Sequence, residues 1–227
     1  MDHPLRLMTW NVRSLRDDRD AVVGVLRRAA PDVLFVQEAP RFLRARSKLA
    51  ALARESDLVV VCGGRPAAGV AILSSLRMSV ETVHEVKLPK SKDLHQRGVA
   101  IADLALLDVQ FTAAAIHLGL NSEERQRHAS QIQSLIGPAP HSVVGGDLNE
   151  SDAGTTWKHF ADHGADAGAE SHLATYPSSS PTKRIDTIFV PHTWKTRTVS
   201  LTEIADDATL IRATDHRPVT VDVMGWR

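Results

Sequence analysis

Residues 143–149 are Val143-Val144-Gly145-Gly146-Asp147-Leu148-Asn149, a short apolar strand followed by two glycines, an acid and, two residues on, an amide. Paired glycines after a strand allow a sharp turn and a close approach of the backbone to a neighbouring group. The carboxylate of Asp147 and the amide of Asn149 can then face one bound group. A turn of this composition is by itself more often structural than functional, so its interpretation depends on the rest of the chain.

Strands and helices are predicted to alternate at the start of the chain. An apolar strand is expected over residues 5–12, and Asp17-Asp18 open the helix that follows it. The continuous apolar run over 33–36 is typical of a strand covered on both faces, and a second helix is predicted after Pro40, with Phe42 on its apolar face.

The middle of the chain is rich in strands, and helices return towards its end. A helix is predicted from Asn121, which is followed by Glu124 as in a capping box, and a short helix contains Trp157 and Phe160. The small residues of 164–183 predict a loop. Further strands are predicted over residues 58–61, 69–73, 78–86, 98–106, 109–117, 142–145, 185–190, 196–202 and 218–223.

These elements predict an α/β protein, a four-layer α/β sandwich of two packed mixed β-sheets flanked by helices. No proline-, glycine- and serine-rich tract is long enough to act as a linker, so residues 1–227 are predicted to form a single domain. The one cysteine, Cys62, lies in an apolar run and is expected to serve in packing.

The charges of the chain balance, with 27 Lys and Arg against 27 Asp and Glu. A protein that only grips nucleic acid through its backbone charge is usually more basic, so a high-affinity, non-specific binder is disfavoured and an enzyme is not. The sequence shows no pattern of an export signal and no uninterrupted apolar span for a membrane. We therefore expect a cytoplasmic protein, and a monomer.

Acid, amide and imidazole residues recur where predicted strands end. Asn11 ends the first strand, Glu38 follows the second and His117 ends a later one. Asp147 comes after the next, and Asp215-His216 stand just before the last. Strand ends are where α/β folds gather their sites, and an unpaired buried carboxylate is very costly. We expect these residues to share one cleft.

The candidate ligands favour a hard cation. Magnesium takes oxygen ligands and needs only one or two protein carboxylates, which Glu38, Asp147 and Asp215 more than supply. A cysteine cluster and a His-Glu-x-x-His segment are both missing, which argues against zinc. His159 and His163 have the spacing to share a metal on a helix but are interpreted as surface residues.

Two of the eleven histidines stand out, because His117 and His216 each belong to a strand-end motif. An imidazole can stabilise charge on a phosphate or move a proton near neutral pH. The other nine are left without a role.

Taken in order, these segments resemble the endonuclease/exonuclease/phosphatase family, which includes exonuclease III and pancreatic-type deoxyribonuclease. The resemblance spans nearly the whole chain, and its strength lies in six motifs in the right order. They are Thr9-Trp10-Asn11-Val12, Val36-Gln37-Glu38, Ile116-His117-Leu118-Gly119, Gly146-Asp147-Leu148-Asn149, Arg184-Ile185-Asp186-Thr187-Ile188 and Thr214-Asp215-His216-Arg217-Pro218.

The resemblance implies a role for each matched position. Glu38 would be the principal ligand of Mg²⁺, for which Mn²⁺ is a possible substitute, with Asn11 and Asp215 as further metal ligands. Asp147 and Asn149 would position or activate the attacking water. His216 would contact the scissile phosphate or act as the base, and His117, oriented by Asp186, would stabilise the phosphate or protonate the leaving oxygen. The division of acid and base roles among Asp147, His117 and His216 stays open.

Several basic residues are candidates for contact with substrate. Arg13 stands where the exonuclease III branch has an acid and resembles the deoxyribonuclease-like branch; a phosphate clamp and a salt bridge to a site carboxylate are equally open. The matched motif makes Arg184 a second substrate-binding candidate. Two basic runs are either solvated faces or polyanion contacts. They comprise Arg41, Arg44, Arg46 and Lys48, and Lys87, Lys90, Lys92, His95 and Arg97.

The leading hypothesis is a divalent-metal-dependent phosphodiesterase with nuclease activity on DNA or RNA. The second is a phosphatase or phosphodiesterase for a small-molecule or lipid phosphoester, and the third is a catalytically inactive binding module of the same fold. The motifs grip only the phosphate and do not separate the first two. Aromatic residues for base stacking are scarce, and the only tyrosine, Tyr176, lies in the loop before Arg184, which argues against abasic-site repair.

Overall fold

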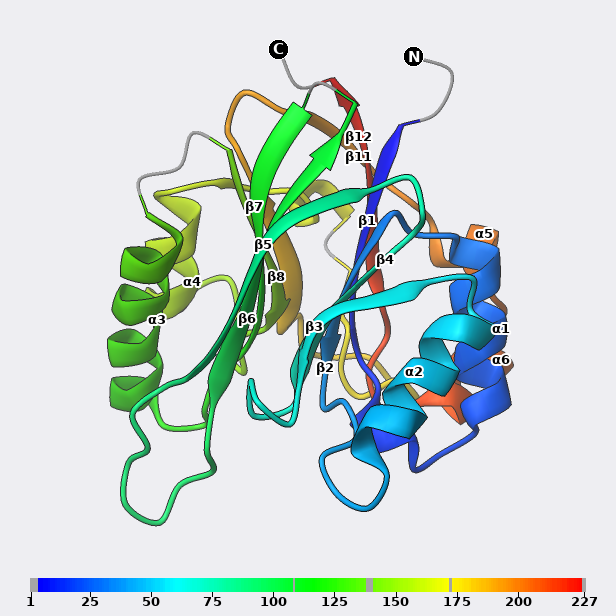
Figure 1. Ribbon diagram of the computed structural model, residues 1–227, viewed down its shortest axis with the longest axis horizontal. Coiled ribbons are helices and arrows are strands. Elements are labelled where there is room, and N and C mark those ends of the chain that lie inside the picture. Colours follow the sequence, from blue (N-terminus) through cyan, green and yellow to red (C-terminus); the bar gives the residue numbers. More distant parts are fainter. Residues whose placement is uncertain (1–3, 108, 138–140, 172, 226–227) are drawn as a thin grey trace.

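Two six-stranded sheets pack face to face in the computed structural model, which describes residues 4–107, 109–137, 141–171 and 173–225 (Figure 1). The first sheet has the order β11 (Lys195–Thr198), β12 (Val219–Gly225), β1 (Leu5–Asn11), β2 (Val33–Gln37), β4 (Val70–Ser74) and β3 (Val59–Gly64). The second has the order β5 (Ser79–Lys87), β6 (Gly98–Leu106), β7 (Val109–His117), β8 (Ser142–Asp147), β10 (Asp186–Val190) and β9 (Ala165–Asp166).

Helices cover the outer face of each sheet (Figure 1). The first sheet carries α1 (Arg19–Ala29), α2 (Ala45–Glu55), α5 (Leu201–Ile204) and α6 (Asp207–Ala213), and the second carries α3 (Ser122–Ile136) and α4 (Thr155–Ala161). Short 3₁₀ turns occur at η1 (Arg13–Leu15) and η2 (Ala169–Ser171). The predicted four-layer sandwich of two mixed sheets flanked by helices is confirmed.

Each sheet is mixed, because it contains one parallel pair of strands among antiparallel pairs. β1 pairs with β2 in parallel across the helical crossover of α1, and β7 pairs with β8 in parallel across α3. The remaining neighbours in the two sheets pair antiparallel. Each parallel pair ends at the lower edge of the sheets in Figure 1.

The paired glycines lie inside β8 and do not form the predicted turn. A Cβ on Gly145 would lie 2.3 Å from Cδ2 of Phe35, the β2 side chain that fills the core between the sheets. A Cβ on Gly146 would lie 2.3 Å from the carbonyl oxygen of Ile116. The predicted close approach of the backbone to a neighbouring group is therefore confirmed for both glycines. The predicted sharp turn at the glycines is wrong, because the strand continues to Asp147.

Two predicted helix starts are confirmed by their caps. The side chain of Asp18 accepts a hydrogen bond from the backbone N–H of Ala21, and that of Asn121 accepts one from Glu124. The second helix begins only at Ala45, and Phe42 lies before it with 80% of its surface exposed. Phe42 is thus outside the core, contrary to the prediction.

The region after β11 differs from the prediction of one strand over 196–202. That strand ends at Thr198, and the short helices α5 and α6 follow. Ser200 and Glu203 form a capping box around the first turn of α5, and Asp206 caps α6 by accepting from the N–H of Thr209. These local hydrogen bonds outweigh the strand propensity of the threonines and valine in this stretch.

Cys62 is buried on β3, as predicted for a packing role, and burial raises the pKa of its thiol to about 12. Within the described ranges, none of the helices is both long and apolar enough to cross a membrane.

Candidate active site

Three adjacent strands of the second sheet place a histidine and two aspartates side by side. His117 at the end of β7 is paired with Asp147 at the end of β8, and Asp186 at the start of β10 is paired with the same Asp147. The ends of β1 and β2 in the facing sheet place Asn11 opposite Gln37, with Glu38 next in the chain. The strand-end residues therefore gather at one edge of the sandwich, as predicted.

Asn11 links the two sheets at this edge. Its Nδ2 atom donates to Glu38 Oε1 at 3.3 Å and to Asp147 Oδ2 at 3.1 Å, and its Oδ1 atom accepts from the backbone N–H of Arg13 at 3.0 Å. Asn11 is only 1% exposed, while Glu38 is half-buried and has a left-handed backbone with φ of 51°. Such a conformation is costly for a glutamate and is typical of functional sites.

His216 is held by a buried carboxylate. Its Nδ1 atom lies 2.9 Å from Asp186 Oδ2, and its Nε2 atom lies 3.8 Å from Asp147 Oδ2. Both aspartates are at most 1% exposed. The imidazole therefore turns its second nitrogen towards Asp147, with its orientation set by Asp186.

His117 has a different partner from the one predicted. Its Nε2 atom lies 3.1 Å from the Nδ2 atom of Asn149 and 3.4 Å from Asp147 Oδ2. The prediction that Asp186 orients His117 is wrong, because β8 lies between β7 and β10 and separates their backbones by about 10 Å. Asn149 takes that orienting role, since its amide N–H can only donate and so makes Nε2 of neutral His117 the acceptor.

Burial and neighbouring charges set the two imidazoles apart. Burial alone would lower the pKa of His216, but the charge of Asp186 and its hydrogen bond raise that pKa to about 9. Burial lowers the pKa of His117 well below its usual value, helped by the positive charge of Arg97. At neutral pH, His216 is therefore a cation and His117 is neutral.

Asp147 is a carboxyl group close to half protonation near neutral pH. Burial, followed by the charge of Asp186, raises its pKa to about 7. Its Oδ1 atom accepts the backbone N–H of Asn149 at 2.9 Å, which fixes the carboxylate relative to the loop after β8. A group poised in this way can orient or deprotonate water.

The oxygen donors around the cleft fit a hard divalent cation. Glu38 and Asp215 keep part of their carboxylates accessible, and Asn11 lies directly behind Glu38. Ligand atoms of Asp147, Asp186 and His216 also lie within 4.8 Å of one another. Asp186 Oδ1 is buried without a hydrogen-bond partner among the described residues, which is the kind of atom that a bound cation would satisfy.

These groups line a cavity of about 570 Å³. Six of the predicted site residues lie on its wall, and Asn11 and Asp186 are buried behind it. The six are Glu38, His117, Asp147, Asn149, Asp215 and His216.

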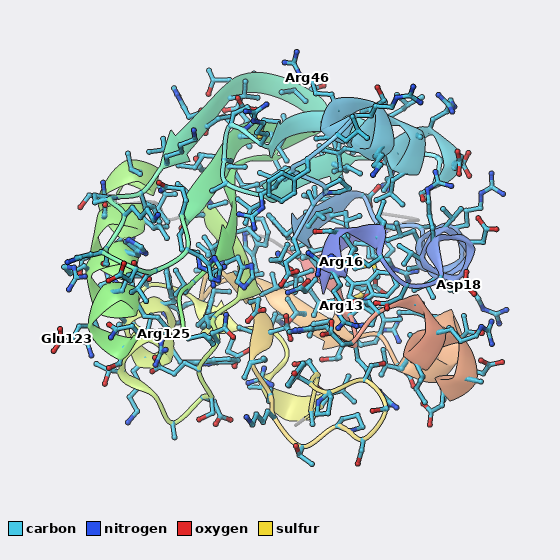
Figure 2. The ribbon with its side chains drawn as sticks, turned by 90° about the horizontal axis from the view of Figure 1, so that it is seen from below. Arg13, Arg16, Asp18, Arg46, Glu123 and Arg125 are labelled. Atoms are coloured by element: carbon cyan, nitrogen blue, oxygen red, sulfur yellow. The ribbon has the colours of Figure 1, made fainter. Side chains whose placement is uncertain are left out.

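The two predicted substrate arginines are both engaged in ion pairs. Arg13 Nε lies 3.4 Å from Asp215 Oδ2, and its NH1 atom lies 3.3 Å from Asp17 Oδ1, which is the salt-bridge alternative for this residue. Arg13 remains exposed near the middle of the face shown in Figure 2. Arg184 forms a double ion pair with Asp166 at 2.8 and 2.7 Å and is not brought to the cavity wall.

The cavity wall also contains residues that belong to none of the strand-end motifs. The ring of Tyr176 lies 4.9 Å from that of His216, centroid to centroid. Arg97 lines the same wall, and its buried Nε atom has no hydrogen-bond partner among the described residues. Arg97 was predicted only as part of a basic run, and Tyr176 lies in a loop without periodicity, so only their place in the fold reveals them.

The sequence matches the description "Endonuclease/Exonuclease/phosphatase family" over residues 8–216, which include every strand-end residue of the cavity. The chain belongs to this family. The match starts within β1 and ends at His216, so it includes both halves of the sandwich.

Solved structures share the fold of this family member at low sequence identity. An endonuclease/exonuclease/phosphatase from Bacteroides vulgatus is 18% identical with a TM-score of 0.76, covering 96% of this chain and 98% of that one. A mannosyl-6-phosphatase from Bacteroides thetaiotaomicron is 15% identical with a TM-score of 0.75, covering 97% and 100%. TDP2 from Caenorhabditis elegans is 18% identical with a TM-score of 0.72, covering 99% and 75%. No curated protein matches the sequence significantly.

Proposed function

We propose that this protein is a divalent-metal-dependent hydrolase of phosphodiester bonds, acting as a nuclease. The observation that carries the proposal is the pair of differently charged imidazoles around Asp147, with His216 held cationic by Asp186 and His117 held neutral. A fixed cation beside a poised carboxylate suits a reaction in which negative charge develops on phosphorus-bound oxygens.

The residues divide the work of hydrolysis by their positions. Asp147 and Asn149 hold the water that attacks phosphorus, since the Asp147 carboxylate accepts a proton near neutral pH. Cationic His216 donates to a non-bridging oxygen of the phosphate, and Asp186 keeps its ring in place. Asn149 donates to Nε2 of neutral His117 and keeps that ring turned towards Asp147 on the cavity wall.

Glu38, Asn11 and Asp215 are proposed to hold the cation, and Mg²⁺ suits their oxygen donors, with Mn²⁺ as a substitute. The cation, when bound, supplies charge neutralisation for the phosphate oxygens. Asn11 positions Glu38 through the hydrogen bond of its Nδ2 atom. The ion pair keeps the guanidinium of Arg13 beside Asp215 of the cavity wall, where it would exchange this carboxylate for an incoming phosphate.

A phosphomonoesterase or small-molecule phosphodiesterase is the second candidate. It is favoured by the similarity over 97% of the chain to the structure of a mannosyl-6-phosphatase. The third candidate, an inactive binding module of the same fold, is disfavoured because every matched catalytic position carries a residue suited to the chemistry.

A panel of substrates separates these candidates. The purified protein is assayed with Mg²⁺ against bis(p-nitrophenyl) phosphate, p-nitrophenyl phosphate, single-stranded DNA, RNA and a lipid phosphodiester. We expect turnover of the diester and of nucleic acid, lost by at least about a hundredfold in His216→Ala. His163→Ala, which removes an exposed histidine, is the matched control and should retain full activity.

Two results would change the proposal. Turnover confined to the monoester or the lipid would keep the mechanism and replace the nuclease by the second candidate. Turnover of the diester that persists in His216→Ala would contradict the mechanism itself.

A further inference from the structure

A second cavity of about 560 Å³ lies beside the catalytic one and shares Arg41 and His95 with its wall. It is lined by basic side chains from three separate segments, namely Arg44 before α2, Arg65 between β3 and β4, and Lys87 at the end of β5. An adjoining hollow continues past the same three side chains to Arg46. We call the surface formed by Arg41, Arg44, Arg46, Arg65 and Lys87 the basic groove.

The basic groove leads from the centre of the face to its rim. Arg16 lines the catalytic cavity and lies near the middle of the view in Figure 2, whereas Arg46 lies at the outer edge. Side chains of both basic runs thus meet on one surface. Arg41, Arg44 and Arg46 follow β2 of the first sheet, whereas Lys87 and His95 lie at the end of β5 and in the loop to β6 of the second sheet.

The positive charge of the basic groove is not balanced locally. Among the described residues, no Asp or Glu lines either of its two hollows. In the described part of the chain, none of its five cationic side chains lies within 4.0 Å of a carboxylate. The whole protein has no net charge, so this is a local separation of charge that would attract an anion.

Arg41 is held at the junction between the two cavities. Its NH1 atom donates to the carbonyl oxygen of Ala68 at 3.2 Å. Its aliphatic stem packs over Gly69, where an added Cβ would lie 2.8 Å from Cδ of the arginine. The guanidinium is therefore preorganised at the end of the basic groove that adjoins the catalytic cavity.

The basic groove also carries an exposed apolar surface. Phe42 and Leu43 line it and are 80% and 82% exposed. An exposed aromatic ring among arginines is the combination on which a base of a single-stranded nucleic acid stacks while its phosphates pair with the cations. A small phosphorylated molecule in the catalytic cavity would not reach Arg46 at the far end.

We propose that the basic groove binds the phosphates that flank the scissile one in a single-stranded nucleic acid, with Phe42 stacking on a base. This inference rests on the proposed function, because it names the substrate class of the same site. The strand runs from the catalytic cavity past Arg41 and along Arg44, Arg65 and Lys87 towards Arg46.

The test compares two triple variants that lose the same charge. The groove variant is Arg44→Ala/Arg65→Ala/Lys87→Ala, and its matched control is Arg54→Ala/Lys158→Ala/Lys195→Ala; all six side chains are exposed. Binding of a fluorescein-labelled 12-nucleotide single-stranded DNA is measured by anisotropy in chelator, so that no hydrolysis is needed. We expect the groove variant to bind at least about tenfold more weakly and the control to match wild type. The slope of log K against log salt concentration should fall, in the groove variant, by the amount expected for about two lost phosphate contacts.

Kinetics and a further variant sharpen the test. The groove variant should lose kcat/KM on the oligonucleotide but not on bis(p-nitrophenyl) phosphate, which has a single phosphate. Phe42→Leu keeps an apolar side chain without the ring, and we expect it to weaken DNA binding by about fivefold or more. Equal DNA binding by the groove variant and its control would overturn the proposal.

The outcomes separate this proposal from the function on which it rests. If no phosphoester is hydrolysed with any metal, the proposed function fails. The anisotropy measurement still shows whether the basic groove binds single-stranded DNA. If groove-dependent turnover is found only for fructose 1,6-bisphosphate, or groove-dependent binding only for phosphatidylglycerol vesicles, the groove binds anions but the nucleic-acid assignment is wrong.

Discussion

The Nδ1 atom of His216, on the cavity wall, lies 2.9 Å from Oδ2 of Asp186, which is buried behind that wall. The backbone carbonyl of His216 also accepts a hydrogen bond from the indole of Trp10 at 2.9 Å. The residue is thus fixed at its ring by β10 and at its backbone by β1. This double attachment keeps a protonated imidazole next to Asp147. His216 lies just before β12, which begins three residues later at Val219.

Asp186→Asn should lower kcat by roughly 10²- to 10⁴-fold, because it removes the charge that keeps His216 protonated and oriented. The measurement is steady-state hydrolysis of bis(p-nitrophenyl) phosphate with saturating Mg²⁺. Asp103→Asn is the matched control. The Asp103 carboxylate accepts a hydrogen bond from the hydroxyl of Thr112 at 2.7 Å, and Asp103 does not line the cavity. Equal activity of the two variants would remove Asp186 from the mechanism.

The pH dependence of kcat/KM should be bell-shaped. Asp147 must be ionised, and its pKa is raised to about 7, so activity is lost as the pH falls through that value. His216 must be protonated, and its pKa is raised to about 9, so activity is lost as the pH rises through that value. A bound cation would move the acidic limb lower, and Asp186→Asn should move the alkaline limb towards the usual histidine pKa. An alkaline limb that stays in place in Asp186→Asn argues against His216 as its source.

Tyr176→Ala should lower kcat by about tenfold, because the tyrosine ring packs on His216 with centroids 4.9 Å apart. Tyr176→Phe keeps the ring and should restore most of the activity. The two variants are compared for kcat and for the alkaline limb of the pH profile. A loss of the same size in both would mean that the hydroxyl, and not the packing, matters.

Gly145→Ala should destabilise the protein by about 1–3 kcal/mol, since the new Cβ would overlap Phe35 between the sheets. Gly24→Ala is the matched control. Apart from the neighbouring backbone of α1, no atom of the described residues lies within 4 Å of its added Cβ, and alanine is favoured within a helix by up to about 1 kcal/mol. Urea unfolding measures both. A neutral Gly145→Ala would show that the sheets can move apart freely.

The layers of the fold and the location of the site were predictable because they follow from local patterns. Apolar runs and helix caps such as Asp18 and Asn121 predict the elements. The polar residues at strand ends, above all Asp147 and Asn149, predict the edge at which the site lies. Both inferences depend on residues that are close together in the sequence.

The partners of each site residue were not predictable, because they depend on the order of strands in the sheet. The sequence does not reveal that β8 lies between His117 and Asp186, and this arrangement assigns Asp186 to His216 and Asn149 to His117. The double ion pair of Arg184 with Asp166 depends on the short strand β9 in the same way. The basic groove likewise arises only when loops of both sheets meet.

Metal dependence of hydrolysis tests the central claim most directly. Turnover of bis(p-nitrophenyl) phosphate is measured after chelation and during titration with Mg²⁺, for wild type, Glu38→Gln and the control Glu123→Gln, an exposed residue at the edge of Figure 2. We expect turnover to vanish in chelator and to return with Mg²⁺ or Mn²⁺, with Glu38→Gln needing roughly 10- to 100-fold more Mg²⁺ and Glu123→Gln matching wild type. Undiminished turnover in chelator, or an unchanged Mg²⁺ requirement in Glu38→Gln, would contradict the assignment of this cleft as a metal-dependent phosphoesterase site.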